Sequence, residues 1–181
     1  MRNPLVSLAV GFVACIILML VGGYAVITSG VINPGADEPI PEWERWMAKS
    51  SLRAYLKREA PNTVNPLEAS EANLKHGIDV YQANCAVCHG GADGARTNVS
   101  NGLYKKPNIF AEEDWSQDKD GLVYWFIEHG VRLTGMPAYG NTLAEKDIWG
   151  LVLLIKNVRK LPAPVKDYWK TSASGYQSDS K

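Results

Sequence analysis

The residues best suited to chemistry lie in one short run, Cys85-Ala86-Val87-Cys88-His89. Two thiols three positions apart on a helical turn lie on one side of the backbone, and the next residue adds an imidazole. Thiols at this spacing can form thioethers with the two vinyl groups of a haem, and the imidazole can then bind the iron. The run therefore predicts one covalently bound haem c, attached through Cys85 and Cys88, with His89 as an axial ligand.

Two other chemistries also use closely spaced cysteines. A thioredoxin-like pair belongs to a βαβ unit, whereas the residues before Cys85 have a helical pattern. A zinc site needs more ligands at paired spacing, and the remaining histidines, His76 and His129, are isolated. Haem attachment therefore explains the run better than either alternative. The third cysteine, Cys15, lies in an apolar stretch and is interpreted as a small hydrophobic residue.

We expect Met136 to supply the second axial ligand to the iron. Gly135 and Pro137 flank it and restrain the backbone on both sides of its thioether. The chain's other methionines precede this part of the sequence: Met1, Met19 and Met47. His129 is the rival ligand, at the end of a predicted helix where the helix dipole favours its cation. A histidine–methionine pair would raise the reduction potential and leave no open position for a substrate.

Helical periodicity predicts the elements that must position these residues. Four amphipathic helices are expected, over residues 42–60, 69–84, 118–129 and 144–160. Ser70 is a plausible N-cap for the second of them. Two segments rich in glycine and small polar residues, 90–101 and 131–142, are expected to be loops. With no convincing strand in the sequence, we predict an all-α fold.

The N-terminal segment has the composition of a membrane span. Leu5 to Val26 is almost wholly apolar, and a helix of that length would measure roughly 33 Å, close to a bilayer core. We predict an uncleaved anchor over residues 1–32. A signal peptide cleaved near Ala25 and a lipoprotein attached at Cys15 are the alternatives. Arg2 before the span favours a cytoplasmic N-terminus, with the rest of the chain outside.

The remainder of the chain divides into three segments. We expect a linker and juxtamembrane helix over 33–66, the haem domain over 67–165, and a disordered tail over 166–181. The helix at 42–60 is either solvated and packed on the domain, or a collar at the membrane surface, or a docking element for a partner subunit. With 19 basic and 19 acidic residues, the chain shows no sign of a nucleic-acid binder.

Several short motifs together resemble a class I, monohaem cytochrome c domain over residues 70–161. They are Gly77-x-x-x-Tyr81-x-x-x-Cys85, the run 85–89, Lys106-Pro107-Asn108, Gly135-Met136-Pro137 and Trp149. The resemblance implies that the first and last helices cross closely at Gly77, with Tyr81 and Trp149 packing at the crossing. It also implies that the Pro107 carbonyl accepts a hydrogen bond from the ring N–H of His89, which would fix the ring.

This resemblance implies an electron-transfer protein rather than an enzyme, exchanging electrons with redox protein partners through an exposed haem edge. We expect a cytochrome tethered to the inner membrane of a bacterium by a single span, with its haem in the periplasm and a respiratory role. The alternative is a fixed haem subunit of a larger respiratory or dehydrogenase complex. A haem enzyme or gas sensor would require Met136 to leave the iron. Lys105 and Lys106 are either a docking patch or ordinary solvated charges.

Overall fold

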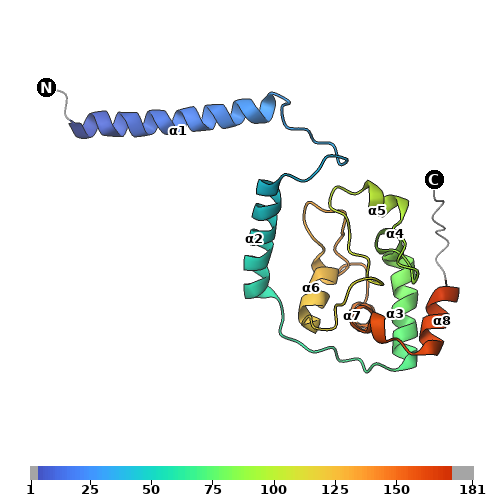
Figure 1. Cartoon of the computed structure of the whole chain (residues 1–181). Helices are drawn as coiled ribbons and strands as arrows, with labels where there is room; N and C mark the ends of the chain where they lie inside the picture. Colours follow the sequence, from blue (N-terminus) through green and yellow to red (C-terminus); the bar gives the residue numbers. More distant parts are fainter. Residues whose placement is uncertain (1–3, 173–181) are drawn as a thin grey trace. The chain divides into compact units, whose positions relative to one another are not determined.

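The computed structural model describes residues 4–172, and all regular secondary structure within that range is helical. The predicted all-α fold is therefore confirmed. The chain divides into two compact units, Met1–Glu38 and Pro39–Lys181, which are described separately below. Figure 1 shows the order of the helices along the chain.

The first unit is built on one long helix, α1 (Pro4–Thr28). None of its residues is buried, and its large apolar side chains are exposed to the surroundings. Among the described residues it is the one helix that is long and apolar enough to cross a membrane, although an N-terminal signal sequence has the same properties.

Two crossing helices form the core of the second unit, α3 (Glu71–Asn84) and α7 (Glu145–Asn157). The expected close approach at Gly77 is confirmed, because a Cβ atom there would lie only 2.5 Å from the Gly150 carbonyl oxygen. The Ser70 side chain accepts a hydrogen bond from the Asn73 N–H, as a helix N-cap does. This crossing fixes the end of α3, from which the cysteine-containing run follows.

Two further helices pack one after the other beside this pair, the first against α7 and the second against the first. α6 (Asp120–His129) packs against α7, with the rings of Tyr124 and Trp149 4.3 Å apart, and ends at Gly130, whose φ is +64°. α2 (Glu42–Glu59) packs on α6 through the rings of Tyr55 and Trp125, whose centroids are 5.7 Å apart. Trp149 is thus buried against α6.

Tyr81 of α3 is buried by aromatic residues outside α6 and α7. Its ring meets Phe110 and Trp169 edge to face, at 6.2 and 5.7 Å. Both aromatic residues that the resemblance placed at the crossing are in the core, and each packs against a different neighbouring element.

Helical structure also occurs where none was expected. α4 (Ala86–His89) follows α3, and α5 (Asn98–Gly102) falls partly within the segment predicted as a loop. The Thr97 side chain caps α5 by accepting the Ser100 N–H. Both α4 and α5 are too short for hydrophobic periodicity to reveal. The helix predicted over 144–160 consists of α7 and a 3₁₀ turn, η1 (Val158–Lys160), that continues from it.

The expected disordered tail over 166–181 is wrong for its first part, because α8 (Ala163–Thr171) is a helix packed beside α3 (Figure 1). Pro164 lies in its first turn, where a proline lacks no needed hydrogen bond. Val165 and Trp169 are 0% and 3% exposed. The compact domain therefore extends beyond residue 165. The rest of the predicted tail, 173–181, lies outside the described residues.

Candidate functional site

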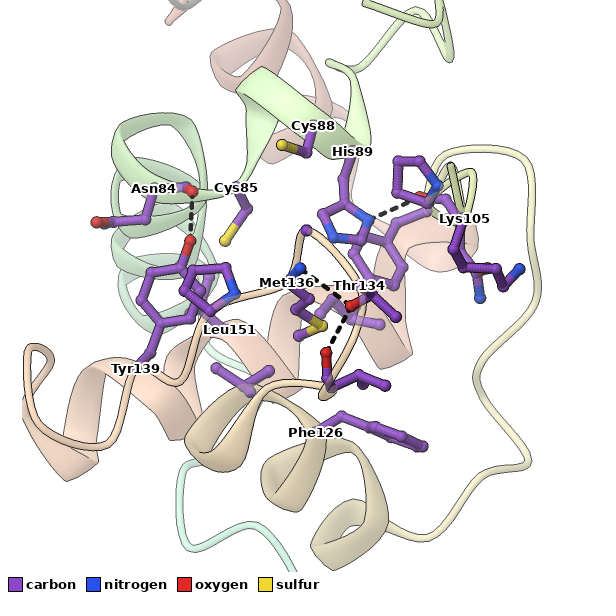
Figure 2. A pocket seen from close by; sticks show the side chains of 18 of the residues that line it. Asn84, Cys85, Cys88, His89, Lys105, Phe126, Thr134, Met136, Tyr139 and Leu151 are labelled. Carbon is purple, nitrogen blue, oxygen red and sulfur yellow. Dashed lines mark hydrogen bonds between the residues drawn. The ribbon is translucent and has the colours of Figure 1, made fainter. Parts of the chain in front are cut away.

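The turn that follows α3 places both cysteines on one wall of a cavity. The Cys85 carbonyl accepts the backbone N–H groups of Cys88 and His89, at 3.0 and 2.9 Å. The Thr97 hydroxyl donates to the Val87 carbonyl and ties the turn to the following loop. Figure 2 shows the Cys85 and Cys88 sulfurs and the His89 ring around the space that also contains the Met136 side chain.

This cavity has a volume of about 470 Å³, within the usual range of small-molecule and cofactor sites. Its lining is largely apolar and comes from several parts of the domain, including Leu52 of α2, Phe126 of α6 and Leu151 of α7. All five site residues predicted from the sequence line it: Cys85, Cys88, His89, Pro107 and Met136. The fold therefore brings together residues that are up to half a domain apart in sequence.

A backbone hydrogen bond orients the His89 ring, but its acceptor is not the expected one. Nδ1 of His89 donates to the Asn108 carbonyl at 2.7 Å, whereas the Pro107 carbonyl accepts from Arg96 at 3.2 Å. The prediction for the Pro107 carbonyl is therefore wrong by one residue. Successive carbonyls of an extended segment point to opposite sides, so only one of the two can face the histidine. Pro107 itself remains part of the cavity wall.

The surroundings of His89 favour the neutral form of its imidazole. Burial lowers the pKa of His89, and the hydrogen bond to Asn108 offsets part of that effect. Because a carbonyl can only accept, Nδ1 carries the proton and Nε2 retains its lone pair. The ring also stacks on Phe110, with centroids 4.5 Å apart. His89 thus has the tautomer and the fixed orientation that metal-binding histidines require.

The two cysteines are thiols rather than thiolates in these surroundings. Burial, together with the neighbouring Cys88, raises the pKa of Cys85 to about 12, and burial also raises the pKa of Cys88. Redox-active cysteine pairs show the opposite shift, since their chemistry depends on the thiolate. The raised pKa values therefore disfavour the thioredoxin-like alternative. No cluster of three or more metal-ligating side chains occurs within residues 4–172, which disfavours the zinc alternative.

The loop that carries Met136 is closed by its own hydrogen bonds. The Thr134 hydroxyl accepts the Met136 N–H at 3.1 Å and donates to the Val131 carbonyl at 2.7 Å, as Figure 2 shows. Leu133 has a φ of +61°, an uncommon value for a non-glycine residue. Tyr139, in the same loop, donates to the Asn84 carbonyl at 2.8 Å. The loop is therefore fastened to the end of α3, next to Cys85.

Both remaining histidines lie away from the cavity. His129 packs against the Trp125 ring at 4.9 Å and lies 3.4 Å from the Glu128 carboxylate. His76 pairs with Asp147 at 2.7 Å and so links α3 to α7. Neither lines the cavity.

Sequence reasoning missed three residues of the site: Asn108 and Thr134, described above, and Trp115. Trp115 lines the cavity, and its indole Nε1 is buried without a hydrogen-bond partner within the described part of the chain. A buried N–H group without a hydrogen-bond acceptor destabilises the fold unless a bound group supplies the acceptor. Asn108 belongs to the motif Lys106-Pro107-Asn108, but no local sequence signal marks Thr134 or Trp115, because their roles follow from how the loops fold.

Known proteins match the part of the chain that contains both cysteines, His89 and Met136. A family model described as cytochrome c oxidase, cbb3-type, subunit III matches residues 72–155. Cytochrome c6 of Synechococcus elongatus is 31% identical over 77 residues, which cover 42% of this chain and 80% of the relative. Cytochrome c6 of Thermosynechococcus vestitus is 31% identical over 80 residues, covering 44% of this chain and 65% of the relative. No solved structure gives a significant match.

The chain therefore belongs to the monohaem c-type cytochromes. Its cofactor is covalently bound haem c, which contains iron, and the function of such a domain is electron transfer with redox partners. The matched residues span most of the second unit but not α2 or α8.

Proposed function

We propose that Cys85 and Cys88 attach haem c and that His89 and Met136 bind its iron from opposite sides. One observation carries this proposal: these four side chains line the same largely apolar cavity. Among the residues lining it, His89 is the one histidine and Met136 the one methionine. A soft thioether opposite an imidazole favours ferrous iron and gives a comparatively high reduction potential.

The cavity also fits the acidic part of a haem. Haem carries carboxylate groups as well as an apolar ring, and the cavity combines apolar walls with the unpartnered Nε1 of Trp115. We propose that this indole N–H donates a hydrogen bond to one haem carboxylate. A charged acceptor would relieve the desolvation cost of a buried donor that is otherwise unsatisfied.

When bound, the haem supplies a centre that stores and releases one electron. The protein's part is to hold that centre rigidly. Asn108 fixes the His89 ring, and Thr134 fixes the backbone of Met136. With His89 and Met136 both bound to it, the iron would have no free position for a substrate, which favours electron transfer over catalysis. The surrounding apolar side chains exclude water, so that little solvent has to rearrange when an electron is transferred.

We further propose that α1 anchors this domain to the inner membrane of a bacterium, with the haem on the periplasmic face and a respiratory role. The length and apolar composition of α1 support an anchor over residues 1–32. Arg2 before the helix, and the acidic Asp37 and Glu38 after it, favour export of the remainder. The expected linker over 33–66 is shorter in the structure, because α2 belongs to the second unit and Leu52 lines its cavity. The residues between α1 and α2 would then connect the anchor to the haem domain.

A second candidate is a fixed haem subunit of a larger respiratory complex. The description of the matching family, an oxidase subunit, favours it. Gentle detergent extraction separates the two candidates. A monomeric protein in detergent supports the carrier, whereas a stable complex of fixed stoichiometry supports the subunit.

Haem attachment is tested by replacing the cysteines one at a time in a host that matures c-type cytochromes. Cys85→Ser and Cys88→Ser should each leave a single thioether, and the double variant should release its haem into acidified organic solvent. Cys15→Ser, outside the haem domain, is the matched control and should retain the haem fully. Retention of haem by the double variant would contradict the proposed attachment.

A further inference from the structure

The side of α2 that faces away from the haem domain carries exposed aromatic residues. Trp43, Trp46 and Met47 are 62%, 69% and 51% exposed, although each is a large apolar side chain. With 3.6 residues per turn, these three positions fall on the same broad face of the helix. A cluster of exposed large apolar groups on one face is a typical binding surface.

The opposite side of α2 is held firmly by the haem domain. The Tyr104 hydroxyl donates to the Glu44 carboxylate at 2.9 Å, and the Tyr55 ring packs against Trp125. Leu52, on this inner side, lines the haem cavity. Anything that binds the outer face of α2 would therefore fix the orientation of the haem domain as well.

The outer face of α2 also has a line of positive charge. Lys49, Arg53 and Lys57 follow Trp46 at three, seven and eleven positions, which places all of them on one side of the helix. They are exposed and form no ion pair within residues 4–172.

The acidic residues of α2 are engaged elsewhere. Glu42 pairs with Arg45 and Glu59 with Arg58, and Glu44 accepts the hydrogen bond from Tyr104. The outer face therefore combines tryptophan with uncompensated lysine and arginine.

Tryptophan with lysine or arginine on one helix face is the composition of a helix that lies in the headgroup layer of an anionic membrane. Residues 29–41 separate α1 from α2, and a chain of that length reaches at most roughly 45 Å. If α1 spans a membrane, α2 stays near its surface. Such a short tether gives an effective concentration on the order of millimolar, so weak affinity for lipid is sufficient.

We propose that the outer face of α2 binds the headgroup layer of an anionic membrane and thereby holds the haem domain in one orientation. This inference rests on the proposed role of α1 as an anchor. It assigns α2 two roles on its two sides: the inner side closes the haem cavity, and the outer side contacts lipid.

The test uses the full, haem-loaded protein in nanodiscs. An environment-sensitive fluorophore is attached at Ser50→Cys, on the outer face, in a Cys15→Ala background. Lys170→Cys, exposed on α8, is the matched control position. In anionic nanodiscs the label at position 50 should shift to the blue and be quenched at least about twofold by brominated lipids. The label at position 170 should do neither.

Two further variants show which chemistry is responsible. Replacing Trp43 and Trp46 with serine, or Lys49, Arg53 and Lys57 with glutamate, should remove more than half of the quenching at position 50. In zwitterionic nanodiscs the charge-reversed variant should differ little from its parent.

The inference is overturned if position 50 is no better shielded than position 170 in anionic nanodiscs. It is also overturned if shielding occurs only when a partner protein copurifies, since the face would then bind protein. Release of the haem domain from the nanodiscs would instead show that α1 is not an anchor. That failure is seen by gel filtration before any fluorescence is read, so the two failures are distinguishable.

Discussion

Both proposed iron ligands are oriented by groups that a motif does not contain. The His89 ring depends on the carbonyl of Asn108, and the Met136 backbone depends on the hydroxyl of Thr134. The first bond orients the imidazole ring itself, and the second holds the backbone from which the Met136 side chain extends. At the scale of the residue, the site is therefore preorganised for an iron that changes its charge but not its ligands.

The role of Trp115 is tested by Trp115→Phe, which keeps the ring and removes the N–H. A haem carboxylate that loses its donor is more negative and stabilises ferric iron, so the reduction potential should fall on the order of tens of millivolts. The pKa of that carboxylate should rise, because its charged form has lost a hydrogen bond. The pH range over which the potential declines should therefore move upward.

Trp169→Phe is the matched control for this prediction. Its indole Nε1 is also buried and unpartnered within the described residues, but Trp169 belongs to α8 and does not line the cavity. Redox titrations across pH should show no change for this variant. Equal effects of the two substitutions would mean that Trp115 acts only through packing.

The chemistry of the site could be predicted from the sequence because its main residues form compact motifs. Both cysteines and His89 lie within the short run 85–89, and Met136 lies between a glycine and a proline. The hydrogen-bond partners could not be predicted in the same way. Whether Pro107 or Asn108 accepts from His89 depends on the direction of one carbonyl, which sequence spacing does not determine.

At the scale of the element, the haem site depends on how closely α3 and α7 approach. In Gly77→Ala the new Cβ would lie 2.5 Å from the Gly150 carbonyl oxygen, and backbone cannot move aside easily. We expect a loss of about 3 kcal/mol in the free energy of unfolding. Denaturant titration of the haem-loaded protein measures it.

Gly150→Ala, on the opposite helix of the same crossing, is the matched control. Its Cβ would meet the His76 side chain at 3.4 Å and the Gly77 backbone at 3.6 and 3.8 Å, all of which are ordinary contact distances. Alanine is the better helix former by about 1 kcal/mol, so this variant should be neutral or slightly more stable. Equal losses for the two variants would contradict a crossing that is tight at Gly77 alone.

Asp120 links three elements at the start of α6. It accepts the Asn65 N–H at 2.8 Å and pairs with Lys156 of α7. Burial alone would raise the pKa of Asp120, but these hydrogen bonds outweigh it and the pKa is lowered. A carboxylate whose pKa is lower in the folded state stabilises the fold above its unfolded pKa, and that contribution is lost as the pH falls below about 4.

Asp120→Asn should therefore cost about 2 kcal/mol near neutral pH and less under acid conditions, where the native carboxylate is protonated too. Glu71→Gln is the control, because its pair with Lys75 is exposed and should contribute under about 0.5 kcal/mol. Denaturant titrations at several pH values give both numbers. A cost for Asp120→Asn that does not shrink in acid would exclude the charge as its cause.

The long helices could be predicted because their apolar residues recur with a clear period. α8 could not be predicted in this way, because it is short and contains a proline, which usually indicates the end of a helix. Its stability comes from Val165 and Trp169, which are buried by tertiary contacts with the rest of the domain. Local pattern carries little information about a helix that exists mainly because of packing.

At the scale of the whole molecule, the proposal joins a redox domain to a membrane anchor. Protease added to the outer face of intact inner-membrane preparations should degrade the chain from about residue 40 onward and leave the α1 segment protected. The reason is that export places everything after the span outside. Immunoblotting with antibodies to the two ends reads the result.

A protected haem domain would contradict this topology. A haem domain recovered in the soluble fraction, lacking α1, would instead show that the N-terminal segment is a cleaved signal peptide. Cysteine labelling at Cys15 distinguishes these cases, because the retained anchor keeps this thiol.

The central claim is that His89 and Met136 both bind the iron. The iron then has no free position, so the protein transfers electrons and binds no substrate. The most direct measurement is the reduction potential of Met136→Ala together with carbon monoxide binding to its reduced form. The account predicts a potential lower on the order of 0.1 V and new carbon monoxide binding, both absent from the control Met47→Ala. An unchanged potential, or carbon monoxide binding by the unaltered protein at neutral pH, would contradict it.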